Sequence, residues 1–178
     1  MTYFFTADQH FGHANIIKYC SRPFQSSEEM DEIIIRNFNQ VVSPADITIH
    51  AGDFTLTKNR EEVQKRYVSR LRGTHIFLNG SHDNWLRNDK TIQQIYQLRI
   101  KELNDQLIVA CHYAMHVWPQ SHYNTWHVYG HSHGRLNLHG KSHDVGVDNN
   151  CFYPVSLDQL VEIMRERPDN PNLVKKGC

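Results

Sequence analysis

The sequence predicts an α/β fold in one domain, and three observations support this class. Short apolar segments of strand length occur at residues 2–7, 47–51 and 75–78, with amphipathic segments of helical length between them. Further strand-like segments follow one another in the second half of the chain. The 178 residues, 39% of them hydrophobic, are enough to build one core. Such an order is typical of an α/β core extended by antiparallel strands.

Helices are expected at three places. Ser26 and Glu29 have the spacing of a capping box, which predicts a helix over residues 28–42. A charged amphipathic segment predicts a second helix over residues 61–71, and a third is expected over residues 157–165. The first two separate the early strands, and the third follows the last strand.

The second half of the chain is expected to consist mainly of strands. Residues 97–102 and 106–111 have the pattern of a hairpin that turns at Asn104. Two more apolar segments, residues 126–129 and 143–147, predict further strands.

Composition restricts the class of protein. We expect a single domain over residues 1–166 and a flexible polar tail over residues 167–178. Apolar runs stay below the ~20 residues of a membrane span, and the N-terminus lacks a signal-peptide pattern. Four scattered cysteines favour a reducing cytoplasm over a disulfide framework. Basic and acidic residues number 19 each, which gives no sign of the basic face that long nucleic acids require.

Histidine is unusually frequent, with 13 copies, and several histidines and aspartates come just after predicted strands. Five strands are followed by such groups, which are Asp8 with His10, Asp53, Ser81 with His82 and Asp83, His112, and His131 with His133. In open α/β sheets, ligands bind at the carboxyl ends of the strands. We therefore expect these five segments to converge.

The residue types indicate transition-metal chemistry. A mixture of imidazoles and carboxylates suits Zn, Fe or Mn better than Mg or Ca, which prefer oxygen ligands. One catalytic metal needs about three protein ligands, and the six or more found here suit two metals that share a carboxylate. Each motif alone is weak, because turns often contain such pairs. Their ordered combination is what predicts a two-metal site.

The ordered motifs Asp8-x-His10, Gly52-Asp53, Gly80-Ser81-His82-Asp83, His112 and Gly130-His131-Ser132-His133 resemble those of the calcineurin-like metallophosphoesterases. The resemblance covers roughly residues 2–148, and residues 5–18 are similar to the small single-domain bacterial and phage members. It implies a four-layer α/β/β/α sandwich of two mixed sheets, with the metal site at the carboxyl ends of the strands.

The resemblance also implies a role for each residue. The implied ligand sets are Asp8, His10, Asp53 and His133 for one metal, and Asp53, His112 and His131 for the other. His82 would face the phosphate and protonate or stabilise the leaving oxygen. Asp83 would orient His82 by accepting its other ring proton.

Ser81 departs from the family pattern. The family has an asparagine at this position, whose amide oxygen is a ligand of the second metal. A neutral serine hydroxyl is shorter and a poorer ligand. Ser81 is therefore expected to be a weak ligand of the second metal, beside Asp53, His112 and His131. The second metal site should have lower affinity than the first.

Three residues are candidates for contacts with substrate, each with an alternative. His13 could donate to a phosphate or only cap the following helix. Arg22 could clamp a phosphate or be an exposed residue near a turn, and Arg135 is a modest candidate for a substrate phosphate. Aromatic residues in 118–126 could stack on a base or an aryl group, or could serve packing. Asp148 could brace the site or serve only the fold.

These residues predict metal-dependent hydrolysis of a phosphate ester by a metal-bridging hydroxide, with a phosphodiester favoured over a monoester. Mn is the favoured metal, with Fe, Ni and Zn as alternatives. Two other functions stay open, a catalytically weakened metal- or phosphate-binding member and a small nucleotide phosphodiesterase or nuclease. The expected partner is a small phosphate ester, with a nucleotide as one candidate, and a homodimer is expected by fold analogy alone.

Overall fold

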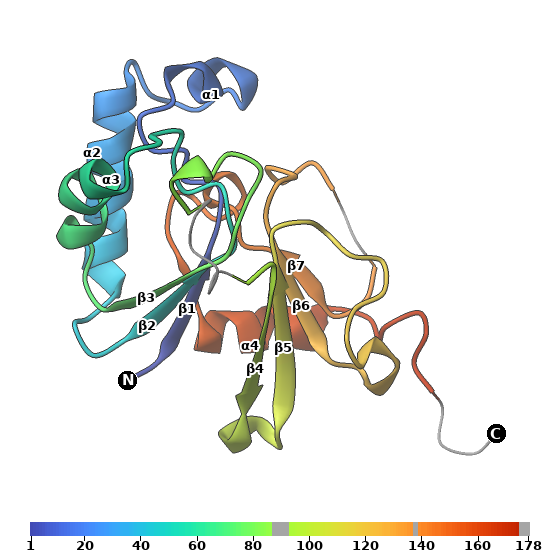
Figure 1. The fold of residues 1–178 in the computed structure, drawn as a ribbon. Helices are drawn as coiled ribbons and strands as arrows, with labels where there is room; N and C mark the ends of the chain where they lie inside the picture. The colour runs from blue at the N-terminus through green and yellow to red at the C-terminus, as the bar shows by residue number, and fades with distance from the viewer. Residues whose placement is uncertain (87–92, 137–138, 175–178) are drawn as a thin grey trace.

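The computed structural model describes residues 1–86, 93–136 and 139–174. In this part the chain has a mixed α/β fold with two four-stranded sheets and four α-helices (Figure 1). The predicted α/β class is thus confirmed. None of the helices in the described ranges has the length and apolar character needed to cross a membrane.

The first sheet has the strand order β3-β2-β1-β8. Its strands are β1 (Tyr3–Thr6), β2 (Ile47–His50), β3 (Thr74–Phe77) and β8 (Val155–Ser156). The strands β1, β2 and β3 are parallel, and β8 is antiparallel to β1. The strand β8 was not predicted, because two residues are too few for a pattern of alternation.

The second sheet has the order β4-β5-β6-β7. Its strands are β4 (Ile95–Ile100), β5 (Gln106–Cys111), β6 (Trp126–Tyr129) and β7 (Ser142–Asp144). The predicted hairpin is confirmed, since β4 and β5 are antiparallel and Asn104 at the turn has a φ of 54°. The strands β5, β6 and β7 are parallel.

The four helices are α1 (Ala14–Tyr19), α2 (Ser27–Val41), α3 (Arg60–Arg66) and α4 (Leu157–Glu166). Of the two hydrogen bonds of the capping box expected for α2, only one forms. The Ser26 hydroxyl accepts from the Glu29 amide, but the Glu29 carboxylate accepts from the amide of Gln25 instead of Ser26. The helix expected over residues 61–71 is also shorter, because the chain continues as a 3₁₀ turn over Val68–Arg70.

The cores show how the layers are stacked. One cluster, with Met30, Ile34 and Phe38 of α2, covers the outer face of the first sheet. A second cluster fills the space between the sheets, and it includes Leu160 and Met164 of α4. Figure 1 shows α2 and α3 on the outer side of β1–β3, with α1 above them. Each of the two sheets therefore has one face in a shared core.

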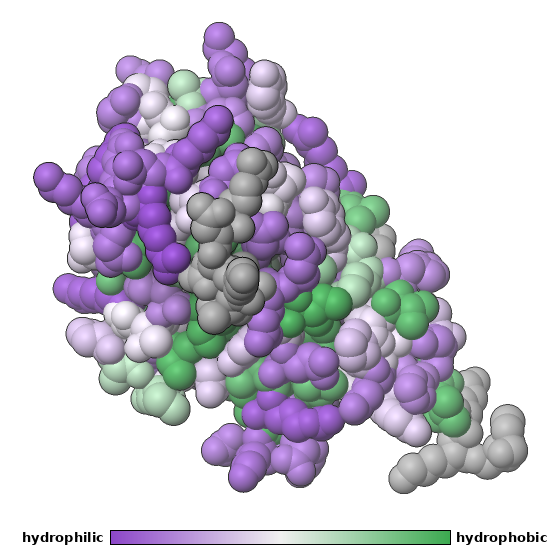
Figure 2. Space-filling view, viewed as in Figure 1, coloured by the Kyte–Doolittle hydropathy of each residue, from purple (hydrophilic) through white to green (hydrophobic). Residues whose placement is uncertain are grey.

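The outer face of the second sheet is covered differently. Leu107 and Val109 of β5 pack there against Trp118, which belongs to the loop before β6. The helix α4 contacts β8, β1 and β7 instead. In Figure 2, hydrophilic side chains predominate over α2 and α3, and apolar patches interrupt the surface over the side where β4 and β5 lie. The complete four-layer sandwich stays a prediction.

The segment after α4 was expected to be a flexible tail over residues 167–178. Residues 175–178 lie outside the described residues. Before them, the buried Asn170 donates through its amide to the backbone oxygens of Ser121 and Thr125, and it accepts from the amide of Lys141. This part of the segment is therefore packed against the second sheet.

Candidate metal centre

The candidate residues follow the strands closely, and hydrogen bonds continue past the strand ends. The amide of Asp8 donates to the Gly52 carbonyl over 3.0 Å, and the amide of His10 donates to the Asp53 carbonyl over 3.0 Å. Ala7 also pairs with Gly146 beyond β7, which joins the two sheets at this end. The segments after β1 and β2 are thus held side by side, and the second sheet is attached to them.

Unusual backbone conformations occur at the candidate ligands. Five of them have positive φ angles, namely Asp8 (59°), His10 (52°), Asp53 (54°), His131 (66°) and His133 (49°). Left-handed conformations are unfavourable for residues with a Cβ and persist where the surrounding structure imposes them. They turn the side chains out of the regular strand direction and toward a common centre.

Two glycines of the motifs allow the segments to approach closely. A Cβ at Gly80 would collide with the amide and the carboxylate of Asp53. A Cβ at Gly130 would collide with the Asp8 carboxylate and with Ala7. This requirement explains glycine before Ser81 and before His131.

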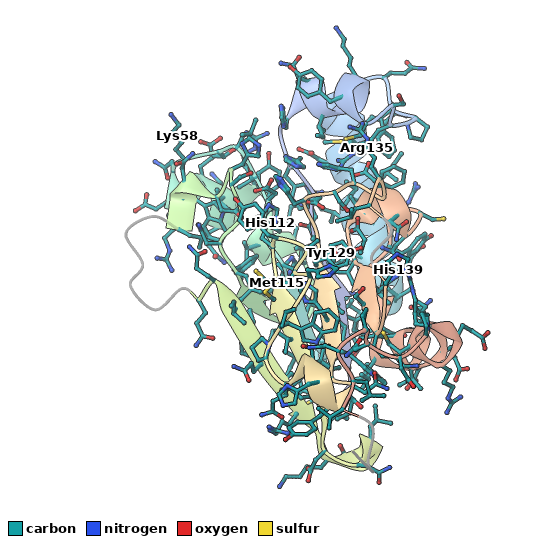
Figure 3. The ribbon with its side chains drawn as sticks, turned by 90° about the vertical axis from the view of Figure 1, so that its right-hand side faces the viewer. Lys58, His112, Met115, Tyr129, Arg135 and His139 are labelled. Atoms are coloured by element: carbon teal, nitrogen blue, oxygen red, sulfur yellow. The ribbon has the colours of Figure 1, made fainter. Side chains whose placement is uncertain are left out.

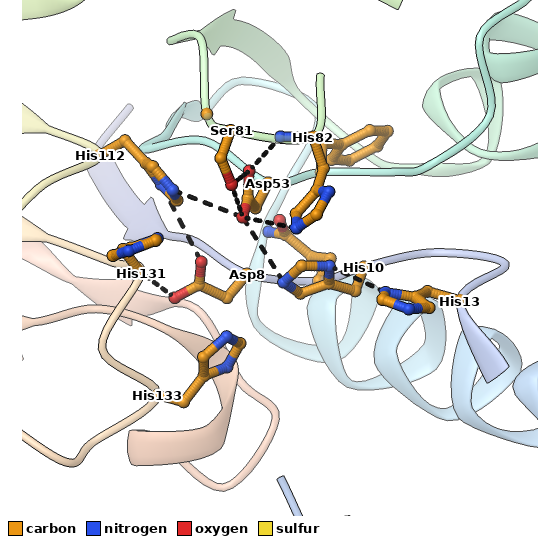
Figure 4. A network of polar contacts seen from close by, with 12 residues as sticks. Asp8, His10, His13, Asp53, Ser81, His82, His112, His131 and His133 are labelled. Carbon is orange, nitrogen blue, oxygen red and sulfur yellow. Dashed lines mark hydrogen bonds and ion pairs between the residues drawn. The ribbon is translucent and has the colours of Figure 1, made fainter. Parts of the chain in front are cut away.

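The candidate ligands form two groups that agree with the sets implied by the resemblance. Nitrogen and oxygen atoms of Asp8, His10 and His133 lie within 4.8 Å of one another, and so do those of Asp53, His112 and His131. The Asp53 Oδ2 atom lies 3.7 Å from His10 Nε2 and 3.4 Å from His112 Nε2, so it stands between the groups. Figure 4 shows Asp53 in this central place.

Several ligand atoms in this centre have no hydrogen-bond partner although they are buried. They are Asp8 Oδ1, His10 Nε2 and His112 Nε2. A buried polar atom without a partner is costly, by about 1–3 kcal/mol each. Imidazole nitrogens and carboxylate oxygens that converge without partners fit divalent cations, which would satisfy all of them.

Hydrogen bonds at Nδ1 orient the rings of His112 and His133. His112 Nδ1 lies 2.9 Å from the Ala51 carbonyl oxygen, which can only accept, so Nδ1 carries the proton and Nε2 is left to face Asp53. His133 Nδ1 lies 2.7 Å from Asp148 Oδ2, which leaves its Nε2 free in the same way. Such contacts fix the tautomer of metal-ligating histidines in proteins.

Burial dominates the electrostatics of the centre. It raises the pKa of Asp8 to about 7, against the charges of His133 and His112. It lowers the pKa of His10 to about 3, although the Asp53 carboxylate opposes this shift. Burial would also raise the pKa of Asp53, but the neighbouring His112, the backbone amide of His82 and the charge of His10 lower it below its ordinary value. The Asp8 carboxylate is thus buried without enough positive charge nearby to stabilise its ionised form. A bound cation would supply that charge.

The role expected for Asp83 is wrong. Its carboxylate accepts from the amides of Asp53 and Phe54 at 2.7 and 2.9 Å, from the amide of Gly80 and from the indole of Trp85. Among the described residues, its hydrogen-bond partners do not include the His82 ring. Asp83 therefore holds the segment that carries Asp53, and it does not orient His82.

Ser81 and His82 lie beside the Asp53 carboxylate. The Ser81 hydroxyl donates to Asp53 at 2.9 Å, and the backbone amide of His82 donates to Asp53 Oδ1 at 2.8 Å. The His82 ring is 44% exposed, with Nε2 4.0 Å from Asp53 Oδ2. It forms a third cluster with His10 and Asp53. His82 is thus at the open side of the centre.

Arg22 is neither an exposed residue nor a contact for substrate. Its side chain is fully buried, and it makes two 2.7 Å bonds to the Asp148 carboxylate. It also donates to the backbone oxygens of Asp8 and Gln9. Burial would raise the pKa of Asp148, but His133 and Arg22 lower it to about 2. Arg22 and Asp148 therefore brace two candidate ligands, Asp8 through its backbone and His133 through its ring.

A pocket of 390 Å³ opens above the centre. Its lining includes His10, Asp53, His82, His131 and His133 together with His13 and Arg135. Figure 3 shows Arg135 beside α1, above His112. Hollows of 530 and 510 Å³ elsewhere are larger, but no candidate ligand lines them. His13 caps α1 without a side-chain hydrogen bond, so a capping role does not explain it.

The two tryptophans of 118–126 serve packing. Trp118 is buried, and its indole donates to the Thr125 carbonyl. Trp126 packs against the core between the sheets. The stacking role left open for this segment is therefore wrong for both tryptophans.

Comparison with known proteins shows which family the chain belongs to. No protein-family model matches the chain. The structure of the protein of unknown function AQ665 from Aquifex aeolicus has a similar fold, with a TM-score of 0.68 and 22% identity over 91% of this chain and 98% of that one. A Methanocaldococcus jannaschii protein, uncharacterized protein MJ1445, is 33% identical over 171 residues, or 90% of this chain and 89% of the relative. At this identity over nearly the whole length, the chain belongs to the same family as MJ1445.

Proposed function

We propose that this protein is a metal-dependent phosphoesterase with a two-metal centre at the carboxyl ends of its parallel strands. The observation that carries the proposal is the convergence of two ligand groups on Asp53, with buried and unpartnered atoms in both. A structural site would be closed, whereas this centre opens into a pocket lined by His82 and His131. Open ligand positions are typical of catalytic metals.

Each ligand has a distinct part in this proposal. The first cation would be held by Asp8, His10, Asp53 and His133, and the second by Asp53, His112 and His131. When bound, the two cations would supply Lewis-acid activation of a water molecule and neutralise charge on the phosphate oxygens. Mn is the favoured metal, with Fe, Ni and Zn as alternatives.

The residues around the ligands complete the proposed chemistry. Asp83 and Gly80 fix the segment of Asp53 so that its carboxylate faces both groups. His82 lies at the mouth, where its ring can reach an oxygen of a bound ester and give it a proton. His13 and Arg135 add donors for an anionic substrate on the pocket wall. A phosphodiester is favoured as substrate, with a monoester as the alternative.

Turnover assays with defined metals test the proposal. After chelation, the protein is supplied with Mn, Ni, Zn or Mg and assayed with p-nitrophenyl phosphate and its bis-ester. We expect turnover of at least one ester that is lost on chelation and restored by Mn. A folded protein that binds the metal but turns over neither ester would support the alternative of a catalytically weakened family member.

Ser81→Asn is expected to strengthen the second metal site. An amide oxygen is a better ligand than the neutral hydroxyl, which here donates to Asp53. Titration with Mn²⁺ should show one tight and one weaker site in the wild type, and the substitution should tighten the weaker one by roughly tenfold. Turnover at limiting metal should rise with it. Ser81→Ala, which removes the hydroxyl without adding a ligand, serves as the control; two equally tight sites in the wild type would contradict the prediction.

Asp148→Asn is expected to weaken the first metal site by roughly 10- to 100-fold, because a neutral amide is a poorer partner for the His133 ring. The second site, which has no contact with Asp148 in the described residues, should keep its affinity. Competition of Mn²⁺ with a chelator measures both values.

Asp144→Asn is the matched control for this prediction. Asp144 is also buried, and it braces the same segment through the Ser132 hydroxyl and the Gly134 amide. It makes no hydrogen bond to a candidate ligand ring among the described residues. Equal losses of metal affinity in the two variants would show that the loop, and not the bond to His133, sets the affinity.

A further inference from the structure

The pocket above the candidate ligands is larger than a phosphate group requires. Its volume is 390 Å³. A phosphate group has only five non-hydrogen atoms, and it would lie at the floor, near the ligands. Much of the pocket is therefore left for the alcohol part of an ester.

This remaining space is bounded by α1 and the residues around it. Ile16, Tyr19 and Cys20 line the pocket on this side, and Leu56 contributes from the segment after β2. The Tyr19 side chain is 64% exposed, and its ring stands edge-on to His13 with 6.3 Å between the centroids. An exposed aromatic ring at the mouth of a pocket offers a face on which a planar group can stack.

The hydrogen-bond donors of the pocket lining suit an anion. Arg135 lies in the same wall and donates to the Tyr19 carbonyl, which ties it to the end of α1. Within the described residues that line the pocket, Asp53 supplies the carboxylate, and the other titratable groups are mainly histidines and Arg135. An aromatic face beside a cation suits an ester that carries both negative charge and a flat ring.

We propose that Tyr19 and Arg135 form an outer subsite for the alcohol part of the substrate, and that this part is a planar aromatic group, as in a nucleoside or an aryl ester. The inference rests on the proposed function, because the phosphate must occupy the metal centre for the alcohol to reach Tyr19. It assigns the substrate contacts to α1, and not to the tryptophans of 118–126, which are packed in the cores.

Binding of two phosphonates tests the subsite, because neither compound is hydrolysed. Isothermal titration calorimetry of the Mn²⁺-loaded protein compares phenylphosphonate with methylphosphonate. The wild type should bind the phenyl compound roughly tenfold more tightly, as stacking on an aromatic side chain predicts. Tyr19→Ala should lose this preference, and Tyr19→Phe should keep it.

Tyr123→Ala is the matched control, since Tyr123 is 68% exposed and lies before β6, outside the pocket lining. This variant should keep the preference for the phenyl compound. An unchanged preference in Tyr19→Ala would overturn the subsite even though the phosphonates bind. If the wild type binds neither phosphonate, the proposed function fails, and the subsite fails with it.

A competition experiment distinguishes a nucleoside from an aryl group as the planar part of the substrate. Adenosine 5′-phosphorothioate and benzylphosphonate are compared for displacement of phenylphosphonate from the Mn²⁺-loaded wild type. Tighter binding of the first identifies a nucleoside, and tighter binding of the second identifies an aryl group. If neither exceeds methylphosphonate, the inference is overturned.

Discussion

Asp53→Asn is expected to abolish turnover and to reduce the affinity of both metal sites. The Asp53 carboxylate stands between the two ligand groups, 3.7 Å from His10 Nε2 and 3.4 Å from His112 Nε2. An asparagine keeps the shape but loses the negative charge that two cations would share. We expect turnover to fall roughly 10³-fold, which corresponds to about 4 kcal/mol of transition-state stabilisation.

The metal content of the Asp53→Asn protein is measured by elemental analysis after dialysis, beside its circular dichroism spectrum and melting temperature. Asp46→Asn is the matched control, because Asp46 is a buried aspartate at the opposite end of β2. It accepts hydrogen bonds from the amides of Thr2 and Ser43, so its loss should cost stability and leave the metals bound. Two full equivalents of metal in Asp53→Asn would contradict a shared ligand.

The positions of the candidate ligands could be predicted because they depend on local sequence and on a general property of sheets. Each follows a short apolar strand, and parallel strands bring their carboxyl ends to one edge. Asp8, Asp53 and His131 therefore meet although they lie far apart in the chain. The short elements were harder to predict, since α1 has six residues and β8 has two.

The contacts that support the ligands could not be predicted, because tertiary packing decides them. Arg22 and Asp148 are 126 residues apart, and no local pattern links them. The family resemblance implied a bond between Asp83 and the His82 ring. In the structure, four backbone amides and the Trp85 indole donate to the Asp83 carboxylate instead. Such competition depends on which amides the fold leaves unpaired. The one signal in the sequence was the position of Asp148 just after the last predicted strand, residues 143–147.

His82→Ala is expected to lower turnover by roughly 10²- to 10⁴-fold, the usual range for loss of a general acid. Its ring lines the pocket and is 44% exposed, so removing it should leave the fold intact. Its hydrogen bond to Asp53 comes from the backbone amide, which an alanine retains. The ligand carboxylate should therefore stay in place, and the variant should bind as much metal as the wild type.

Metal content decides between two roles for this histidine. His10, Asp53 and His82 also form a cluster that could hold a cation, so His82 could itself be a ligand. Loss of metal together with turnover in His82→Ala would establish that role and contradict the proton donor. His122→Ala is the control, because His122 precedes β6, away from the carboxyl ends where the candidate ligands lie. A leaving group that needs no proton gives a further check: the loss of turnover should be smaller for p-nitrophenolate than for an alkoxide, because only the alkoxide depends on the proton of His82.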